Sequence, residues 1–426
     1  MKIKNFHDLA TSEVRDVAMM LAETALQAID THDVMEKNFV LKERTLFISG
    51  KYFPLEDIGR IFVVGVGKCS AEAVSVIEKT LLDIIADGIV LCASEEKFNK
   101  VRTYCGTHPF PTIANVEATS EIIKMLSGMT ERDLVIFVIS GGGSTLLCQP
   151  QSITCESEAN ILKKLFDAGA TIEEINVLRK HISSARGGFL AKYAYPARVA
   201  SLIFSDVPGD DIGLVASGPT VKDTTTINDA KKILEKYNLS NNALIEASLI
   251  ETPKEDIYFQ NVWNTVIISN KVALKAMEEK AKELGYTPII KTNTLSGEAR
   301  DIGAKIVEEL HSAPSKTILL YGGEPTVTVK KPGKGGRGME LVLSASRTVG
   351  KGELVMSIAS DGMDNSDFAG ALCDIMTLEK AKGFGLSPEK YLEENMSYKF
   401  FEYAGDFLMT GSTGSNVSDL IVGIKI

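Results

Sequence analysis

Residues 61–68 read IFVVGVGK, an apolar run that ends in two glycines and a lysine. β-Branched and aromatic residues favour strands, and glycine permits a sharp turn after a strand. The same pattern recurs in DLVIFVISGGGS (133–144), ASLIFSDVPGDD (200–211), KTILLYGGEP (316–325) and VMSIASDGMD (355–364). Each predicted strand is therefore followed by glycine, aspartate or proline at its carboxyl end.

Helical patterns separate these predicted strands. They span residues 70–87, 114–128, 271–285 and 297–311. Strands that alternate with helices predict parallel sheets with right-handed crossovers, and therefore an α/β fold. Open α/β sheets bind ligands at the carboxyl ends of their strands, so we expect the glycine-rich loops to form a binding site.

The length of the chain predicts two domains, because 426 residues exceed what one hydrophobic core usually supports. The segment 221–260 interrupts the alternation with two short helical patterns and the polar stretch ETPKED, before the strand NTVIISN (264–270) begins. We place the boundary near residue 250. This gives an N-terminal α/β domain over 1–250 and a C-terminal α/β domain over 251–426.

Composition and charge narrow the class of protein. With 44% hydrophobic and 24% charged residues, the chain has a soluble, globular composition. Its net charge of −10 argues against nucleic acid or an anionic membrane as a partner. No apolar run reaches the roughly 18 residues of a membrane span, and residues 1–30 predict an amphipathic helix, not a signal peptide. The six cysteines form no CxxC pair, which favours reduced thiols in a cytoplasmic protein.

The first glycine turn matches neither common nucleotide-binding signature. A Walker loop requires glycine and Ser or Thr where this chain has Phe62 and Cys69. A dinucleotide fingerprint requires a third glycine where the chain has Ser70. What the turn offers is Lys68 at the start of a helix, an arrangement that can hold a carboxylate or phosphate. A solvent-facing lysine is an equally good interpretation.

The stretch SGGGST (140–145) is a more specific signal. Three consecutive glycines leave a bare backbone that can cradle phosphate oxygens, and their cost in conformational entropy disfavours a purely structural turn. The G-x-S-x-G pattern of a nucleophile elbow is absent. We predict a phosphate-binding loop made of Ser140, Gly141, Gly142, Gly143 and Ser144.

A basic cluster lies in NVLRKHISSARGG (176–188). Arg179, Lys180 and His181 are adjacent, so on a helix they point about 100° apart and at most one or two can face one ligand. His181 is the only histidine that this reasoning places near candidate chemistry. A structural or surface role is the favoured interpretation for it.

Acidic residues follow two predicted strands. Asp206 comes directly after the strand SLIF, where a carboxylate can accept a proton or hold a metal. SDGMDNSD (360–367) does not match the EF-hand spacing. Asp361 and Asp364 there can hold magnesium or cap the helix that follows, and the sequence favours neither role.

The stretch GGEPTVTVKKPGKGGRGMEL (322–341) combines a strand, a glycine-rich turn and the start of a helix. Two cations among four glycines favour a polyanion clamp over a flexible loop. Arg337 can make forked contacts that Lys334 cannot.

Eight motifs, taken in order, resemble those of one family. They are VGVGKCS, VISGGGSTLL, NVLRKHIS-x-x-RGG-x-LA, SDVPGDD-x-x-x-x-ASGPT, GGEPTVTV, GKGGR-x-x-E, ASDG-x-DN-x-x-x-AGA and G-x-TG-x-NV-x-DL, spread over residues 61–420. Their order is similar to that of the MOFRL-type glycerate kinases. The resemblance implies an N-terminal Rossmann-like parallel sheet with flanking helices, a C-terminal α/β MOFRL domain, and an active site between them.

The resemblance also implies roles for individual residues. The invariant lysine of the family falls on Lys68, its aspartate after the third strand on Asp206, and its clamp arginine on Arg337, and we take these three as catalytic. The substrate- and nucleotide-binding residues are Ser140, Gly141, Gly142, Gly143, Ser144, Arg179, Gly218, Glu324, Gly335 and Gly336, and the metal ligands are Asp361 and Asp364. The family usually has GGRNQE where this chain has GGRGME, so we expect altered contacts to nucleotide or substrate at Gly338 and Met339.

The implied activity is phosphoryl transfer from ATP to D-glycerate with Mg²⁺ or another divalent cation, at the 2-hydroxyl to give 2-phosphoglycerate. Alternatives are phosphorylation at the 3-hydroxyl, a hydroxypyruvate reductase and a sensor that binds a sugar acid. The reductase requires a nicotinamide site, and no G-x-G-x-x-G with a downstream acidic residue is present. We expect a cytoplasmic monomer or homodimer with a small-molecule substrate and no nucleic-acid or membrane partner.

Overall fold

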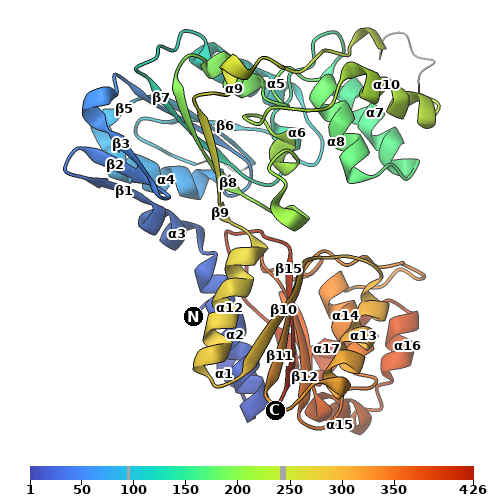
Figure 1. The fold of residues 1–426 in the computed structure, drawn as a ribbon. Coiled ribbons are helices and arrows are strands. Elements are labelled where there is room, and N and C mark those ends of the chain that lie inside the picture. Colours follow the sequence, from blue (N-terminus) through green and yellow to red (C-terminus); the bar gives the residue numbers. More distant parts are fainter. Residues whose placement is uncertain (94–95, 240–245) are drawn as a thin grey trace. The chain divides into compact units, whose positions relative to one another are not determined.

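The computed structural model describes residues 1–93, 96–239 and 246–426 of the chain, which form two compact units. The central unit comprises Val34–Ile267, and the terminal unit combines Met1–Asp33 with Ile268–Ile426. Each unit contains its own six-stranded sheet with flanking helices (Figure 1). The sequence placed one boundary near residue 250, whereas the contacts divide the chain after residues 33 and 267.

The central unit is built on a sheet with dinucleotide-fold topology. Its strands are β4 (Ile61–Val66), β5 (Ile85–Cys92), β6 (Arg102–Cys105), β7 (Leu134–Ile139), β8 (Arg198–Phe204) and β9 (Val262–Ile268). They lie in the order β6-β5-β4-β7-β8-β9, and the first five of these pair in parallel. Numbered along the chain, this is the 3-2-1-4-5-6 order of Rossmann folds. The order reverses between β4 and β7, so the loops after these strands start at the topological switch point.

Helices cover both faces of this sheet. Val64 and Val66 point to one face, where α5 (Ile113–Leu126) and α9 (Phe189–Ala194) complete the core. Gly65 points to the other face, where an added Cβ would lie 2.9 Å from Val74 of α4 (Ser70–Leu81). Other elements among the described residues of this unit include the antiparallel strands β1 (Phe39–Lys42), β2 (Thr45–Ile48) and β3 (Lys51–Pro54), and the helices α3 (Thr31–Asn38), α6 (Gly143–Leu146), α7 (Cys155–Asp167), α8 (Ile172–His181) and α10 (Ile227–Lys236).

One predicted helix of this unit ends earlier than expected, and another falls partly outside the described residues. The sequence predicted a helix over 70–87, but α4 ends at Leu81 and β5 begins at Ile85. The pair Ile84-Ile85 fits the helical period and a buried strand equally well, so the sequence does not fix this boundary. Of the two helical patterns predicted in 221–260, one is α10, and the other includes residues 240–245, which lie outside the described residues.

The sheet of the terminal unit is mixed. Its strands are β10 (Thr287–Leu295), β11 (Thr317–Gly323), β12 (Glu353–Ala359), β13 (Gly370–Cys373), β14 (Phe407–Leu408) and β15 (Asp419–Lys425), in the order β10-β11-β15-β12-β13-β14. β15 pairs antiparallel with both β11 and β12. The prediction of a parallel sheet is wrong here, because β15 enters the sheet from the edge at which β11 and β12 leave it.

Helices also flank this second sheet on both sides. Figure 1 shows α2 (Glu13–Ala28) and α12 (Asn270–Glu283) on one face, and α13 (Ala299–Ser312) and α14 (Arg337–Ala345) on the other. The other helices of the unit are α1 (Phe6–Leu9), α15 (Ile375–Gly383), α16 (Pro388–Glu393) and α17 (Ser397–Ala404). Within the three described ranges, no helix combines the length and apolar character that crossing a membrane requires.

A buried ion-pair network attaches the N-terminal segment to the terminal unit. Arg15 of α2 is 1% exposed, and its Nε donates to Asp374 Oδ2 at 2.7 Å while its Nη1 donates to Asp406 Oδ1 at 2.7 Å. Burial alone would lower the pKa of Arg15, but its bonds to the two carboxylates outweigh burial and raise it. The amphipathic helix predicted at the N-terminus therefore has a specific polar anchor as well as an apolar face.

Replacement of Arg15 should destabilise the terminal unit. Arg15→Met should lower its free energy of unfolding by about 3–5 kcal/mol, because the substitution leaves the buried Asp374 without its cation and the buried Asp406 with Lys380 alone. Denaturant unfolding followed by circular dichroism measures this loss. Arg347→Met is the control, since Arg347 forms an exposed ion pair with Glu389 at 3.6 Å and should change stability by less than about 1 kcal/mol. Equal effects of the two substitutions would contradict the anchoring role.

Candidate functional site

The loops after β4 and β7 are tied together at the switch point of the central sheet. Gly67 has a φ of +116°, and a Cβ there would lie 2.2 Å from Ser140 Oγ, so only glycine fits. The Lys68 N–H donates to the Gly141 carbonyl at 3.0 Å, and the Cys69 N–H donates to Ser140 Oγ at 3.1 Å. Lys68 and the predicted phosphate loop are thus neighbours.

The loop after β8 reaches the same place. A Cβ added to Gly141 would lie 2.0 Å from Asp206 Oδ2, so the aspartate packs directly against the glycine loop. Within that loop, the N–H groups of Gly141, Gly142 and Ser144 donate to no protein atom of the described residues. Several backbone donors without a protein acceptor are typical of an anion-binding loop.

Cations converge on this loop. The Cβ position at Gly142 is 3.4 Å from Lys68 Cγ and 3.5 Å from His108 Cδ2. Partial burial, together with the positive charges of Lys68 and Arg179, lowers the pKa of His108. Among the described residues, no carboxylate lies within ion-pair distance of Lys68 or Arg179. The loop and these side chains therefore form a positively charged site, which we call the switch-point site.

The basic cluster of α8 divides in the way that helical geometry predicts. Lys180 Nζ donates to Asp223 at 3.2 Å, and the buried His181 contacts the Ile250 carbonyl at 2.9 Å through Nδ1 and Thr225 Oγ1 at 3.1 Å through Nε2. These two residues are structural, and only Arg179 belongs to the switch-point site.

His108 was missed by the sequence reasoning, which considered only His181. It follows β6, the short edge strand RTYC, whose mostly polar residues give a weak strand signal. The signal that could have found it is the same as elsewhere in the chain, a strand that ends in glycine, here as GTHP (106–109).

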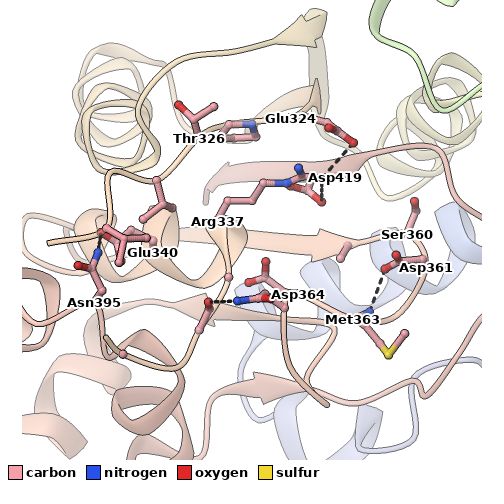
Figure 2. A pocket seen from close by; sticks show the side chains of 18 of the residues that line it. Glu324, Thr326, Arg337, Glu340, Ser360, Asp361, Met363, Asp364, Asn395 and Asp419 are labelled. Atoms are coloured by element: carbon pink, nitrogen blue, oxygen red, sulfur yellow. Dashed lines mark hydrogen bonds and ion pairs between the residues drawn. The ribbon is translucent and has the colours of Figure 1, made fainter. Parts of the chain in front are cut away.

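The terminal unit contains a pocket of about 590 Å³ at the ends of three neighbouring strands (Figure 2). Asp419, the first residue of β15, pairs in register with Gly323 of β11 and Ala359 of β12. The residues that follow those two strands therefore lie beside Asp419. Six residues predicted from three motifs line this pocket: Glu324, Gly335, Gly336, Arg337, Asp361 and Asp364.

Arg337 is held between two carboxylates of this pocket, as Figure 2 shows. Its Nε donates to Asp419 Oδ2 at 2.6 Å, and its Nη2 lies 3.0 Å from Glu324 Oε1. Burial raises the pKa of Asp419 to about 7, with Arg337 acting in the opposite direction. The guanidinium is therefore fixed in orientation at the pocket wall.

Lys334 does not line the pocket beside Arg337, although the predicted polyanion clamp requires both cations at one site. Its Nζ lies 3.1 Å from Asp367 Oδ1 and 3.6 Å from the ring centroid of Tyr398. The two cations of the GKGGRG loop are separated because the glycines turn the chain between them.

Asp364 caps a helix, although not the one that the sequence suggested. Its Oδ1 and Oδ2 accept the N–H groups of Gly338 at 3.1 Å and Met339 at 2.6 Å, at the start of α14. Burial raises the pKa of Asp364 to about 6. Asp361 is less enclosed, and its Oδ1 accepts the Met363 N–H at 3.0 Å.

The raised pKa of Asp364 makes stability depend on pH. Because its pKa is higher in the folded state than the ordinary 3.8, its contribution is complete below 3.8 and is lost as pH rises through about 6. The melting temperature of the wild type relative to that of Asp364→Asn should therefore fall over this range. Thermal unfolding at several pH values measures the difference.

The matched control for this experiment is Asp367→Asn. Hydrogen bonding to Lys334 lowers the pKa of Asp367, so its contribution is lost only as pH falls below 3.8. The corresponding difference in melting temperature should stay flat as pH rises from 3.8 to 6. Parallel profiles for wild type and Asp364→Asn would contradict the role of burial.

Known proteins share this architecture. Residues 17–249 match the family model described as Domain of unknown function (DUF4147), and residues 317–419 match the MOFRL family. The chain is 35% identical to glycerate 2-kinase of Pyrococcus horikoshii, over 97% of this chain and 97% of that protein. The chain belongs to the MOFRL-type glycerate kinase family. This confirms the family predicted from the order of the eight motifs.

One solved structure and a further relative are also similar to this chain. A crystal structure from Thermotoga maritima, titled glycerate kinase, matches with a TM-score of 0.87 at 32% identity, covering 96% of this chain and 99% of that chain. A relative from Agrobacterium vitis is provisionally named a hydroxypyruvate reductase, and is 35% identical over 85% of this chain and 86% of its own length.

The departure from the glycerate kinase clamp motif has a visible packing consequence. A Cβ at Gly338 would lie 2.7 Å from Ser357 Oγ and 3.2 Å from Asp364 Oδ2. Met339 is fully buried and lies outside the lining of the pocket. The replacement of Asn by Gly338 therefore removes a side chain from a space that Ser357 and Asp364 enclose.

A divalent cation, expected for a glycerate kinase, fits the pocket of the terminal unit chemically. Its lining includes the carboxylates of Glu324, Glu340, Asp361, Asp364 and Asp419. No group of three or more potential metal ligands occurs among the described residues, but Mg²⁺ usually takes one or two carboxylates and completes its shell with water and phosphate. Asp361 suits this role, whereas both oxygens of Asp364 already accept backbone N–H groups.

Three other predicted binding residues, Ser140, Gly143 and Gly218, have structural roles around the switch-point site. Ser140 is buried and its hydroxyl accepts the Cys69 N–H. Gly143 packs against Ala216, where an added Cβ would approach to 2.6 Å. Gly218 lies in a buried turn whose carbonyl accepts the Gly188 N–H at 2.8 Å. In the terminal unit, the sequence reasoning did not single out Asp419, which is the first residue of β15.

Proposed function

We propose that the protein is an ATP-dependent kinase that phosphorylates D-glycerate at the 2-hydroxyl to give 2-phosphoglycerate. The observation that carries this proposal is the switch-point site, where Lys68 and backbone N–H groups without a protein acceptor meet at the reversal of a 3-2-1-4-5-6 sheet. Membership of the glycerate kinase family supports the choice of substrate. Phosphoryl transfer depends mainly on positioning and charge neutralisation, which such a site supplies.

The proposed step assigns one role to each group. The Asp206 carboxylate orients the glycerate hydroxyl and accepts its proton as the hydroxyl oxygen bonds to the γ-phosphorus of ATP. The bond between that phosphorus and the β–γ bridging oxygen breaks, and ADP leaves. Lys68 and the loop N–H groups neutralise charge on the phosphoryl oxygens or on the glycerate carboxylate.

The terminal unit is proposed to contribute charge stabilisation. Arg337, oriented by Asp419 and Glu324, stabilises negative charge on the transferred phosphoryl group. Asp361 is the proposed ligand of Mg²⁺, which would neutralise phosphate charge when bound. We further propose that the enzyme is cytoplasmic, consists of monomers or homodimers, and has no nucleic-acid or membrane partner.

Phosphorus NMR of the product from ATP and D-glycerate tests donor, acceptor and regiochemistry together. Phosphate on carbon 2 couples to one methine proton and gives a doublet, whereas phosphate on carbon 3 couples to two methylene protons and gives a triplet. We expect the doublet. A triplet would reassign the enzyme to the 3-hydroxyl, and unchanged ATP would reject the kinase activity.

A second candidate function is hydroxypyruvate reduction, which the name of the Agrobacterium vitis relative suggests. It requires a nicotinamide site, but the turn after β4 has Lys68 and Ser70 where a dinucleotide loop has small residues and a third glycine. Titration with NADH, followed by its fluorescence, separates the two functions. We expect no saturable change.

A further inference from the structure

An apolar pocket of about 450 Å³ opens beside the switch-point site, within the central unit. Its walls include Phe110, Leu162, Phe166 and Ile172. Phe110, Phe166 and Ile172 are 57%, 73% and 56% exposed, so three large apolar side chains that normally lie inside are open to solvent at one place. The volume falls within the roughly 300–1,000 Å³ of small-molecule sites.

Two arginines, Arg179 and Arg186, line this pocket, and within the described part of the chain only Arg186 forms an ion pair. Arg186 is fully buried, and its Nη1 donates to Glu158 at 2.6 Å, so its charge is compensated. Arg179 forms no ion pair among the described residues, and its Nε, like that of Arg186, is buried without an acceptor. Burial and the neighbouring Arg186 lower the pKa of Arg179 to about 10. Glu158 acts on Arg179 in the opposite direction but already pairs with Arg186, so a half-buried arginine with no ion pair of its own favours an anionic ligand.

The pocket and the phosphate loop share a wall. Ser144 and Thr145 line the pocket and also belong to the SGGGST loop. A phosphate chain bound along the loop N–H groups would therefore pass Arg179, and whatever is attached to that chain would enter the apolar pocket.

The ligand that combines these features is a nucleotide. Its phosphates require cations and N–H donors, and its flat base is stabilised by burial against aromatic and aliphatic side chains. The pocket of the terminal unit offers the opposite chemistry, since five carboxylates and Arg337 line it. Nucleotide phosphates would be repelled there in the absence of a metal ion.

We propose that the pocket lined by Phe110, Leu162, Phe166 and Ile172 binds the adenine base of ATP, with Arg179 contacting its phosphates. This rests on the proposed kinase function, because ATP is the donor in that reaction. Base recognition is then mainly apolar and separate from phosphate recognition, so the two can be weakened independently.

Ala159 offers a way to fill the pocket without touching the phosphate loop. It lies on α7, is only half-buried and lines the pocket, whereas the adjacent Asn160 is exposed and outside the lining. Calorimetric titration of the full chain with ADP, and separately with inorganic tripolyphosphate, compares Ala159→Trp with the control Asn160→Trp. Tripolyphosphate carries the charge of the nucleotide but no base.

We expect Ala159→Trp to raise the Kd for ADP by about tenfold or more, with the Kd for tripolyphosphate and both values of Asn160→Trp unchanged. Wild-type Kd values that are equal for ADP and tripolyphosphate, or an unchanged Kd of Ala159→Trp for ADP, would overturn the proposal. Equal weakening of both ligands by Ala159→Trp would also overturn it, since the pocket would then not be specific to the base.

The outcome is separable from that of the kinase proposal. Titrations that behave as expected, together with no phosphorylation of D-glycerate, would reject the kinase and leave the base pocket. Normal turnover of D-glycerate by Ala159→Trp with an unchanged KM for ATP would reject the base pocket and leave the kinase.

Discussion

Lys68→Ala should lower kcat for D-glycerate phosphorylation by about 10³-fold, because it removes the cation that we propose neutralises charge on the phosphoryl oxygens or on the glycerate carboxylate. Lys68 is exposed, and its side chain makes no hydrogen bond or ion pair with the described residues, so its removal should leave the melting temperature unchanged. Steady-state turnover with ATP and D-glycerate gives the rate, and thermal unfolding gives the stability.

The matched control is Lys79→Ala on α4, the helix that begins two residues after Lys68. Lys79 is 73% exposed and forms a surface ion pair with Glu36 at 3.3 Å, so its loss should affect neither turnover nor stability. If Lys68→Ala retained more than about a tenth of wild-type kcat, Lys68 would be the solvent-facing lysine that the sequence allowed as an alternative.

Arg337→Met should lower kcat by about 10²–10³-fold through loss of charge stabilisation. It should also lower stability, because Asp419 would remain buried without its cation. Arg337→Lys keeps the charge but loses the fork between Asp419 and Glu324, and should recover only part of the activity.

The variant that combines Arg337→Met with Asp419→Asn separates these two effects. Removal of the buried carboxylate charge should restore the melting temperature while kcat remains low. Should the double variant regain both stability and activity, Arg337 would serve only to neutralise Asp419 and would have no part in the reaction.

Much of the fold was accessible from the sequence because long apolar strands that end in glycine give a strong signal. β4, β7 and β11 lie within the predicted stretches, whereas β8 and β12 each begin two residues before theirs. The mixed terminal sheet was not accessible, because the direction of β15 depends on pairing between residues distant in the chain. The place of residues 1–33 in the terminal unit was not accessible either, because it depends on contacts of Arg15 with Asp374 and Asp406, which are distant in the chain.

The candidate site was likewise predictable from the sequence only in part. Glu324, Arg337 and Asp361 lie in glycine-containing motifs, and the structure places all three at one pocket. Asp419 and His108 lie in stretches with weaker local signals, next to a strand start and a short polar strand. Their positions follow from strand register and from the packing of Gly142, which no local pattern specifies.

The anchoring of α2 has a consequence for synthesis on the ribosome. Arg15 emerges early, but its carboxylate partner Asp374 lies 359 residues further along. The central unit, Val34–Ile267, is complete in the nascent chain long before that partner exists. Because α2 packs against α12 and also against β12 and β15, we expect part of its apolar face to stay uncovered, and open to chaperones, until these last strands have been made.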